Sequence, residues 1–444
     1  ITLQQADLAI DNAALTKKQN QFSRLPNLNG FTSFGFNFGR SIDPTTNQFE
    51  SQNIRSNNFN LSTSMPLYSG GQITNSIKQS NYDMQAAELD KAASENTTAL
   101  NVATAYLNVL FMQDQLTITQ NRLKQTVDQL AQTNKLIQAG SLPDANRIDL
   151  EAQKASDEQG LIVAENNLLL AYLQLKQTMN MDPGAAMEIE RPAVLAPEVS
   201  LVDTYTLESL YSEALSTQPN IKANEIRERS SETGIKVAKG ALLPSLNFSG
   251  NVNTNYSSLG LDFGNPSITN VRIEEVPQDA IIDNNQTTII FLDEAADVSF
   301  PDQKYFDQLD QNLSQNVGVN LNIPIFNRLT NRINVQRAEL DVINSQLNSE
   351  NARIQLKADI QRALTDAIAA KKQLESSKIT LDARDQAFKN AEKRYDLGSI
   401  NSFEYNQAKD NLDVARSNEA FSKYDFLFKL KVLDFYLGKP ITLE

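Results

Sequence analysis

The chain of 444 residues contains no histidine, no cysteine and no tryptophan. Histidine is the commonest general base and, like cysteine, a usual zinc ligand, while the cysteine thiolate is a frequent nucleophile. Their absence leaves carboxylates as the main source of catalysis, so we expect no enzyme, no cofactor and no metal site. We therefore also expect no disulfides and no lipidated N-terminal cysteine, and the lack of cysteine leaves the redox compartment unassigned.

Basic residues are also few. Lysine and arginine number 40 against 54 aspartates and glutamates, which gives a net charge of −14 and a pI near 4.7. Proteins that bind nucleic acid neutralise phosphates with clustered basic side chains. The charge balance therefore predicts no nucleic-acid partner.

Long hydrophobic runs are missing as well. The richest stretch, 161–175, is interrupted by Glu165 and two asparagines, so we predict no transmembrane helix. If the protein meets a membrane, we expect a closed β-barrel, the other fold that satisfies its backbone in lipid. The sequence opens on Ile1 without a basic and apolar leader, and we expect that any export signal has been removed. Apolar residues make up 40% and the mean hydropathy is −0.40, which favours elongated elements over one thick globule.

The sequence does contain one pattern of residues that occurs twice, at an offset of 258 residues. Pro66 and Pro324 each close an alternating apolar and polar run, and Gly140 and Gly398 each follow a long helical pattern 74 residues later. The intervening positions match without an insertion. This predicts an internal duplication with pseudo-twofold symmetry.

Four stretches alternate with a period of two, and they predict β-hairpins at 25–69 and 242–326. One face of each strand is apolar and the other carries Asn and Ser. A half-buried sheet of a soluble protein explains any single strand, but four uncharged amide faces favour a water-filled lumen. Four strands cannot close a barrel, which takes about eight, so we infer a trimer with a twelve-stranded barrel. The strand residues expected to face lipid are Leu28, Phe34, Phe36, Phe38, Phe59, Leu61, Leu246, Phe248, Val252, Val319, Leu321 and Ile323.

Two unusually long helices are predicted at 70–139 and 327–397. Apolar residues recur every seven positions in each, from Val102 in the first and from Ile360 in the second, which is typical of an under-wound, coiled-coil-like helix. A plain two-stranded coiled coil is the simple alternative. Small and amide residues between the seams instead favour a helix with two packed sides and one wet side, as in an α-helical tube.

Each long helix is followed by a short break, at 140–143 and 398–401, where glycine and helix-capping residues predict a tight turn. Return helices are expected at 144–180 and 402–437, and a further helix at 207–241. The helices 144–180 and 207–241 together contain about as many residues as the long helix 70–139. This is the length expected if the two shorter helices stack end to end in a tube wall.

The opening helix, 1–24, is shorter than the pattern requires. Leu3 lies 23 residues before Pro26, whereas Leu207 lies 37 residues before Pro244. Either the helix is truly short, or residues near 12–18 are missing from the sequence. We favour the second, because a tube wall lacking four turns would leak.

Two segments, the linker and the acidic insert, are not repeated. Residues 181–206 contain three prolines and are predicted to form an equatorial linker outside the helices, and 438–444 is a tail. The insert 257–315 holds eleven acidic and two basic residues. Its spacing lacks the pattern of a calcium loop, so we interpret it as a solvated extracellular loop, with a small hairpin between 271–276 and 287–292.

The chain resembles the TolC-like outer-membrane efflux protein family over essentially its whole length. The resemblance lies in the duplicated order of helix, strand, strand, long helix, glycine turn and helix, in the segment Leu242-Leu243-Pro244-Ser245-Leu246, and in Arg394-Tyr395-Asp396-Leu397-Gly398-Ser399. It implies an α+β membrane protein: a trimeric twelve-stranded β-barrel, four strands per chain, continued by a long α-helical coiled-coil barrel. It also implies an outer-membrane location in a Gram-negative bacterium, with the helices extending into the periplasm.

The resemblance further implies a periplasmic tip at the two glycine turns, where an adaptor docks and the tube is pinched shut. Residues expected to contact the adaptor are Gly140, Ser141, Leu142, Gly398, Ser399 and Ile400. The family's gate tyrosine corresponds to Tyr395 and its carboxylate to Glu404, with Asn146 at the equivalent position of the first half. An arginine of the family pattern is replaced by Ile400, and Arg147 or Arg394 is the candidate substitute. Tyr395 fits equally well as a core residue that continues the heptad seam.

The function implied is a passive homotrimeric exit duct of a tripartite efflux pump or a type I secretion system. Its partners would be a periplasmic adaptor, or membrane fusion, protein, an inner-membrane pump or ABC exporter, and outer-membrane lipid. The alternative is a non-channel periplasmic coiled-coil scaffold. That alternative gives no role to four amphipathic strands.

Overall fold

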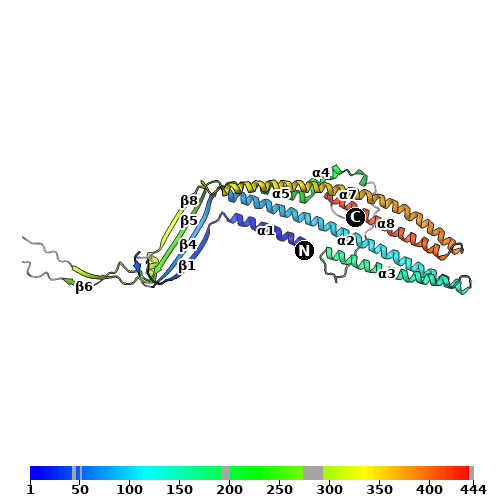
Figure 1. Cartoon of the computed structure of the whole chain (residues 1–444), viewed down its shortest axis with the longest axis horizontal. Helices are drawn as coiled ribbons and strands as arrows, with labels where there is room; N and C mark the ends of the chain where they lie inside the picture. The colour runs from blue at the N-terminus through cyan, green and yellow to red at the C-terminus, as the bar shows by residue number, and fades with distance from the viewer. Residues whose placement is uncertain (43–46, 51–52, 192–200, 274–293, 440–444) are drawn as a thin grey trace, which may run out of the picture. The chain divides into compact units, whose positions relative to one another are not determined.

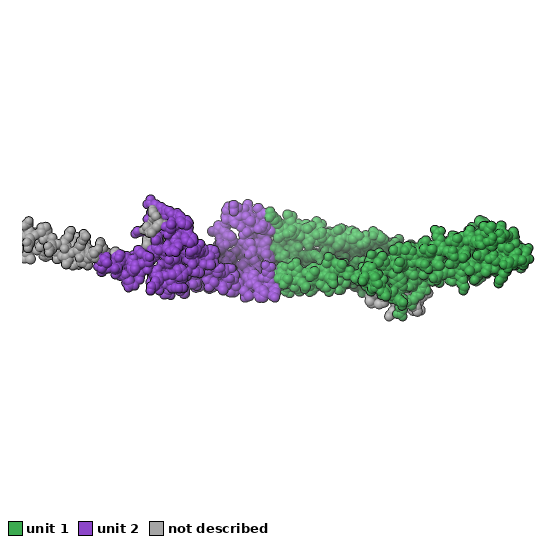
Figure 2. Space-filling view, turned by 90° about the horizontal axis from the view of Figure 1, so that it is seen from below, with its two compact units in different colours: residues 1–17, 77–235, 336–444 green, residues 18–76, 236–335 purple. Residues whose placement is uncertain are grey.

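The computed structural model describes the chain except for residues 43–46, 51–52, 192–200, 274–293 and 440–444. The chain divides into two compact units, which Figure 2 shows in different colours. Unit 1 comprises residues 1–17, 77–235 and 336–444, and unit 2 comprises residues 18–76 and 236–335. None of the described helices carries a stretch apolar enough to serve as a membrane span.

Unit 2 is built on an antiparallel sheet in the strand order β1-β4-β5-β8 (Figure 1). The strands are β1 (Asn27–Asn37), β4 (Ile54–Ser69), β5 (Ser245–Ser257) and β8 (Ser314–Asn322). Apart from Ile323, which lies just beyond β8, and Phe38, just beyond β1, the predicted apolar strand residues fall within these bounds. Both edge strands, β1 and β8, have one side without a partner strand in the described chain.

The register separates the side chains of the sheet into two faces. Leu61 pairs with Val252 and Phe248 pairs with Val319, and directly paired residues of neighbouring strands share a face. We call the two sides the apolar face and the amide face. The apolar face carries Leu28, Phe34, Phe36, Phe59, Leu61, Leu246, Phe248, Val252, Val319 and Leu321, and the amide face carries Asn29, Asn60, Asn247, Asn251, Asn253 and Asn320.

Smaller elements complete unit 2. Strand β2 (Ser41–Ile42) pairs with β3 (Phe49–Glu50), and β6 (Ser267–Ile273) pairs with β7 (Glu294–Ser299). Most of the hairpin predicted between 271–276 and 287–292 lies outside the described residues, and only 271–273 fall within β6. A short helix, α6 (Tyr305–Gln311), follows within the predicted insert.

The remaining helices lie largely in unit 1. They are α1 (Thr2–Phe22), α2 (Gln72–Gln138), α3 (Ala145–Thr178), α4 (Leu207–Thr217), α5 (Pro219–Gly240), α7 (Thr330–Asp396) and α8 (Ser402–Tyr436), with a 3-10 turn at Leu201–Thr204. Helices α2 and α7 have 67 residues each, and both of their bounds differ by the offset of 258. The boundary between the units falls within α1, α2, α5 and α7.

The predicted helix 207–241 is wrong as a single element, because α4 ends at Thr217 and α5 begins at Pro219. Proline lacks the N–H that a helix interior needs, and its fixed φ suits the first turn of a new helix. In α1, residues 12–18, where a gap was expected, lie inside one unbroken helix.

The core of unit 1 is apolar where α4, α5, α7 and α8 meet. The α7 seam is buried there as predicted, with Ile360, Ala367 and Leu374 at 1% exposure or less. Helix α2 differs, because nearer its end it buries the hydroxyls of Thr126 and Thr133. The two long helices thus share their length but not their packing.

The turns that lead into α2 and α7 adopt the left-handed conformation at matching positions. Gly70 and Gly71 have φ of 60° and 78°, and Arg328 and Leu329, 258 residues later, have φ of 55° and 62°. Only glycine adopts this conformation without steric cost. The turn before α2 therefore adopts the left-handed conformation with glycine, whereas the turn before α7 adopts it with two non-glycine residues whose backbone is strained.

Candidate functional site

The two turns at the ends of the helical hairpins, 140–143 and 398–401, are the predicted tip turns. Gly140 and Gly398 have φ of 71° and 68°. In each turn the glycine N–H donates to the carbonyl three residues back and the following serine N–H donates to the carbonyl five residues back, at 2.8–2.9 Å. This pair of bonds is the Schellman motif, which satisfies the last carbonyls of a helix. Both turns are therefore closed in the same way.

Tyr395 packs inside the second hairpin. Its ring lies 4.9 Å from that of Tyr405, in an apolar cluster of α7 and α8 that also includes Phe388, Leu412 and Ile400. The Tyr395 hydroxyl is buried and has no hydrogen-bond partner among the described residues. Burial also raises the pKa of Tyr405 to about 12. This placement is the core position that the heptad seam predicts for Tyr395.

The other predicted gate residues are not joined to Tyr395. Glu404 is exposed in the first turn of α8, where its backbone N–H donates to the Asn401 side chain at 2.9 Å. Arg147 forms ion pairs within the start of its own hairpin arm, with Asp144 at 2.9 Å and Glu151 at 2.8 Å. Hydrogen bonding to Asp144 and Glu151 holds the pKa of the Arg147 guanidinium above its usual range.

Asn146 is half-buried and Arg394 is exposed. Among the described residues, no hydrogen bond or ion pair links the side chain of Arg147 or Arg394 to the opposite turn. The structure therefore does not bring the predicted gate residues into one constellation within a single chain.

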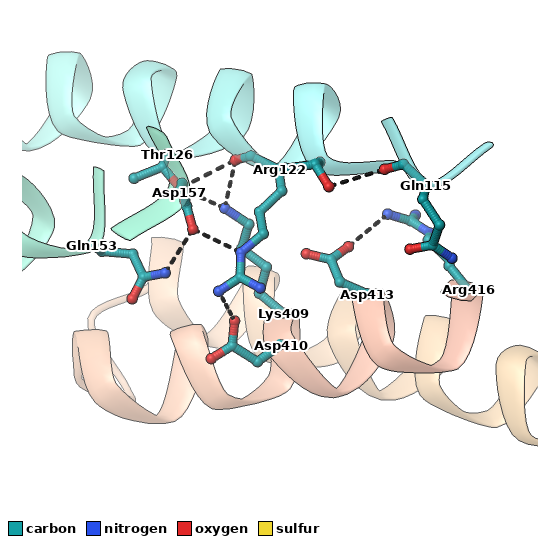
Figure 3. Close-up of polar contacts among 10 residues, drawn as sticks. Gln115, Arg122, Thr126, Gln153, Asp157, Lys409, Asp410, Asp413 and Arg416 are labelled. Atoms are coloured by element: carbon teal, nitrogen blue, oxygen red, sulfur yellow. Dashed lines mark hydrogen bonds and ion pairs between the residues drawn. The ribbon is translucent and has the colours of Figure 1, made fainter. Parts of the chain in front are cut away.

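A buried polar network that the sequence analysis missed joins the two hairpins farther along their helices (Figure 3). Arg122 of α2 binds Asp157 of α3 at 2.7 Å and Asp410 of α8 at 2.6 Å. Thr126 donates to the second Asp157 oxygen at 2.6 Å. The Lys409 ammonium of α8 donates to the Thr126 hydroxyl at 2.7 Å and to the Arg122 carbonyl at 2.9 Å. We call these five residues the clasp.

The centre of the clasp is buried, whereas Arg122 and Asp410 at its edge are partly exposed. Asp157 is 2% and Lys409 3% exposed, and Gln153 donates a further hydrogen bond to Asp157 at 2.9 Å. Burial lowers the pKa of the Lys409 ammonium, while Asp157 and Asp413 oppose that shift. Burying charges is costly unless they are paired and hydrogen-bonded. The clasp satisfies this condition only when α2, α3 and α8 lie together.

Asp413, one turn beyond Lys409, completes the polar strip on α8. One of its oxygens lies 3.3 Å from Arg416, and the other is buried without a partner in the described chain. Burial raises the pKa of the Asp413 carboxyl. A signal for this strip exists in the sequence, because Lys409 lies four residues after Tyr405 and three before Leu412, on the inward side of the helix.

The sheet of unit 2 is the second region with predicted functional residues. The apolar face is exposed at most of its positions, including Phe34, Phe36 and Leu321, and the amide face is linked internally, with Asn60 donating to Asn251 at 2.8 Å. Exposed apolar surface on this scale is unusual for a protein surrounded by water. The face is therefore a candidate contact surface.

Comparison with known proteins gives one family match. The family model described as outer membrane efflux protein matches residues 2–181 and 210–439. No curated protein sequence matches the chain significantly.

Solved structures show the same fold at low sequence identity. A crystal structure of CusC is similar with a TM-score of 0.73 and 18% identity, over 99% of this chain and 89% of that one. The CmeC outer membrane channel of Campylobacter jejuni gives 0.69 and 17%, over 98% and 82%. The open state of the MtrE outer membrane channel of Neisseria gonorrhoeae gives 0.68 and 17%, over 100% and 87%. The chain thus belongs to the outer membrane efflux protein family, whose members are outer-membrane channels extending into the periplasm and not enzymes.

Proposed function

We propose that the protein is the exit duct of a tripartite efflux pump or a type I secretion system, a passive homotrimeric channel opened at its periplasmic tip by an adaptor. The observation that carries this proposal is the sheet of unit 2, which has one apolar face, one amide face and two edges unpaired by any described strand. In a membrane the apolar face would contact lipid and the amide face would line a water-filled lumen.

Closure of the sheet requires more than one chain. An open sheet edge in lipid leaves backbone groups without hydrogen bonds, so a membrane-spanning sheet must close. Four strands are too few, because about eight form the smallest practical barrel, whereas three chains supply twelve. Pairing β1 of one copy with β8 of the next satisfies both edges with one type of contact.

The helices carry apolar stripes that fit the same assembly. The stripes are exposed and recur every seven residues, as coiled-coil seams do when their partner helix is absent. They comprise Leu8, Leu15 and Phe22 on α1, Ile162 and Leu169 on α3, and Leu340, Leu347 and Ile354 on α7. Helix α1 leads into β1 and α7 follows β8, so two of the three helices with such seams are next to the edge strands in sequence. We propose that they pack between copies as the wall of an α-helical tube.

The two tip turns would dock the adaptor and close the tube. Tyr395, Glu404, Asn146, Arg147 and Arg394 are the proposed gate residues, acting between copies rather than within one chain. The adaptor would prefer the open state and shift the population toward it. The partners proposed are this adaptor and an inner-membrane pump or ABC exporter.

Cysteine cross-linking tests the assembly directly, because the native chain has no cysteine. Ser33→Cys lies in β1 and Asn316→Cys in β8, both on the amide face. Treatment of membranes with a short thiol cross-linker is expected to give covalent species that end at three chains in the double variant. Each single variant serves as a control and should stay monomeric. A ladder that ends at two chains, or extends far beyond three, contradicts the proposal.

The alternative of a periplasmic coiled-coil scaffold is distinguished by its behaviour in detergent. A channel is extracted from membranes only with detergent and runs as a heat-modifiable trimer. A scaffold is soluble without detergent.

A further inference from the structure

Helix α6 lies on the apolar face of the sheet and not over the amide face. The Tyr305 ring is 4.7 Å from that of Tyr256 on β5, and its hydroxyl accepts a hydrogen bond from Asn57 on β4 at 2.9 Å. The Thr254 hydroxyl donates to the Leu309 carbonyl at 2.6 Å. Asn57, Thr254 and Tyr256 share the face of Phe59 and Val252, as the strand register shows. This part of the insert therefore does not cover the amide face as a lid.

The orientation of α6 is inverted relative to a helix on a water-exposed surface. Gln308 points inward and is 1% exposed, whereas Phe306 points outward and is 79% exposed. The Gln308 amide oxygen accepts a hydrogen bond from the Ser257 N–H at 3.0 Å, and its nitrogen donates to the Gln303 carbonyl at 3.1 Å. A surface helix normally turns its apolar residues inward and its amides outward. Specific hydrogen bonds thus hold the outward position of Phe306.

The contact surface of α6 is continuous with the apolar face and lies over the central strands. Its partners Asn57 and Tyr256 belong to β4 and β5, while the edges available to a second copy are β1 and β8. A neighbouring copy that pairs at an edge would leave α6 uncovered. The continuity with the exposed apolar face points to lipid as the occupant.

The position of α6 along the strands fits a membrane boundary. It contacts the ends of β4 and β5 that are farther in sequence from α2 and α5, which the proposed function places at the outer leaflet. From Leu246 to Tyr256 the apolar face covers about 24 Å at ~3.4 Å per residue and ~45° tilt, close to the ~25 Å apolar band of such proteins. Tyr68, paired with Leu246, provides an aromatic residue at the other end.

The composition of α6 also fits this boundary. Tyrosine is enriched where acyl chains meet head groups, because its ring is apolar and its hydroxyl is polar. Asp310 follows Phe306 by four residues and shares its side of the helix. A side that carries both a phenyl ring and a carboxylate suits the head-group level better than the middle of the bilayer.

We propose that α6 is an interfacial anchor, seated at the boundary between acyl chains and head groups of the outer leaflet, with Phe306 inserted into lipid. This inference rests on the proposed function, because it requires the apolar face to contact a membrane. The contact of Phe306 with lipid would fix the depth at which the sheet sits in the bilayer.

Tryptophan fluorescence in vesicles tests the anchor, because the native chain has no tryptophan and each variant therefore carries one indole. Phe306→Trp reports on α6, Leu61→Trp on the middle of the apolar face, and Phe31→Trp on the amide face. The vesicles contain phosphatidylcholine brominated either near the head group or near the chain ends, and iodide serves as the aqueous quencher.

The expected result is that Phe306→Trp loses most fluorescence with bromine near the head group, Leu61→Trp with bromine near the chain ends, and Phe31→Trp only with iodide. If Leu61→Trp is quenched by lipid but Phe306→Trp responds only to iodide, the anchor is wrong and the proposed function stands. If neither responds to lipid, both fail. Strongest quenching of Phe306→Trp near the chain ends also contradicts a boundary position.

A second position protects the test against a misfolded variant. Leu313→Trp lies just beyond α6 and is exposed, so it is expected to show the same preference for bromine near the head group.

Gly260→Ala tests how Gln308 positions the helix, because the added Cβ would lie 2.4 Å from the Gln308 amide nitrogen. In the Phe306→Trp background it should reduce quenching near the head group, and unchanged quenching would show that the Gln308 seat does not position Phe306.

Discussion

The two helical hairpins, α2–α3 and α7–α8, have the same turn and nearly the same length but differ in what they bury near the tip. The second hairpin closes on an apolar cluster of Phe388, Tyr405 and Leu412. The first buries Leu150 but also the polar Thr126, Thr133 and Asp157, and it reaches across to Lys409 of α8 for part of its hydrogen bonding. The second hairpin is therefore stabilised by its own core, whereas the first depends on α8.

This difference bears on how a tip can open. Apolar packing holds α7 and α8 to each other without strict geometry, whereas charged hydrogen bonds are directional and are lost when their partners separate. Opening that moves the second hairpin as a unit would keep its cluster and break the clasp. We therefore expect substitutions in the clasp and in the cluster to have separable effects.

The largest effect is expected from Asp157→Asn, which removes the buried carboxylate that accepts hydrogen bonds from Arg122, Thr126 and Gln153 and leaves Arg122 with Asp410 alone. Breaking one partner of a buried ion pair costs about 3–5 kcal/mol. The measurement is the thermal midpoint in detergent, followed by far-ultraviolet circular dichroism. The control, Glu158→Gln, removes the neighbouring carboxylate of the exposed pair with Lys154 and should cost less than about 1 kcal/mol. Equal midpoints for the two variants would contradict a stabilising clasp.

Leu412→Ala is expected to destabilise the second hairpin by about 3 kcal/mol, because it leaves a cavity at a position that is 1% exposed. Lys154, 258 residues earlier, is the counterpart in the first hairpin and lies at the surface. Lys154→Ala should change stability by less than about 0.5 kcal/mol. Comparable losses in the same melting experiment would show that the hairpins are packed alike near their turns.

The turns that begin α2 and α7 give the next comparison. A Cβ on Gly70 would lie 2.2 Å from the Gly240 carbonyl oxygen, so Gly70→Ala should cost about 2 kcal/mol. Arg328→Gly, at the matching position, should instead gain about 1 kcal/mol by relieving left-handed strain. Chemical denaturation of the two variants against the parent measures both signs. A loss of stability in Arg328→Gly would mean that its side chain makes a contact worth more than the strain.

The caps of the two return helices differ in a smaller way. The Asn401 side chain accepts the Glu404 N–H, whereas Asp144 makes no capping hydrogen bond with its side chain. Asn401→Ala should cost about 1 kcal/mol. Asp144→Ala should cost less, because it removes only an exposed ion pair with Arg147. Hydrogen exchange measures this: Asn401→Ala should speed exchange in the first turn of α8 more than Asp144→Ala speeds it in the first turn of α3. The opposite order of the two increases would contradict the difference in capping.

The smallest effect concerns pH. Burial raises the pKa of Asp413 above its usual 3.8, so the folded chain binds a proton there more readily than the unfolded chain. The parent therefore loses stability as pH rises through the folded pKa, and Asp413→Asn avoids this loss. Asp413→Asn should melt higher than the parent at neutral pH, and the difference should vanish as pH falls. Asp128→Asn, an exposed position on α2, is the control and should show no such trend.

Much of the fold was predictable because its signals are periodic. The seven-residue seam and the glycine turns placed α2 and α7 within three residues of their observed ends, and alternation identified the strands of the sheet. The division of 207–241 was also present in the sequence, as Pro219, but helical periodicity outweighed it in the prediction. The placement of α6 on the apolar face had no periodic signal.

The clasp was missed for a physical reason. Charged residues such as Asp157 and Lys409 are almost always exposed unless they are paired, and their partners lie on three different helices. Spacing within one helix does not show which charge meets which across the core. The predicted gate residues have the opposite difficulty, since the proposal places their partners on other copies of the chain.

Single-channel conductance in planar bilayers tests the central claim most directly. The claim is that copies of this chain form a passive conduit held nearly shut at the tip. The account predicts small, rare openings for the purified parent and large, constant currents for a variant that combines Tyr395→Phe with Glu404→Ala. Absence of current from both proteins would contradict the conduit, and unchanged conductance in the variant would contradict the gate.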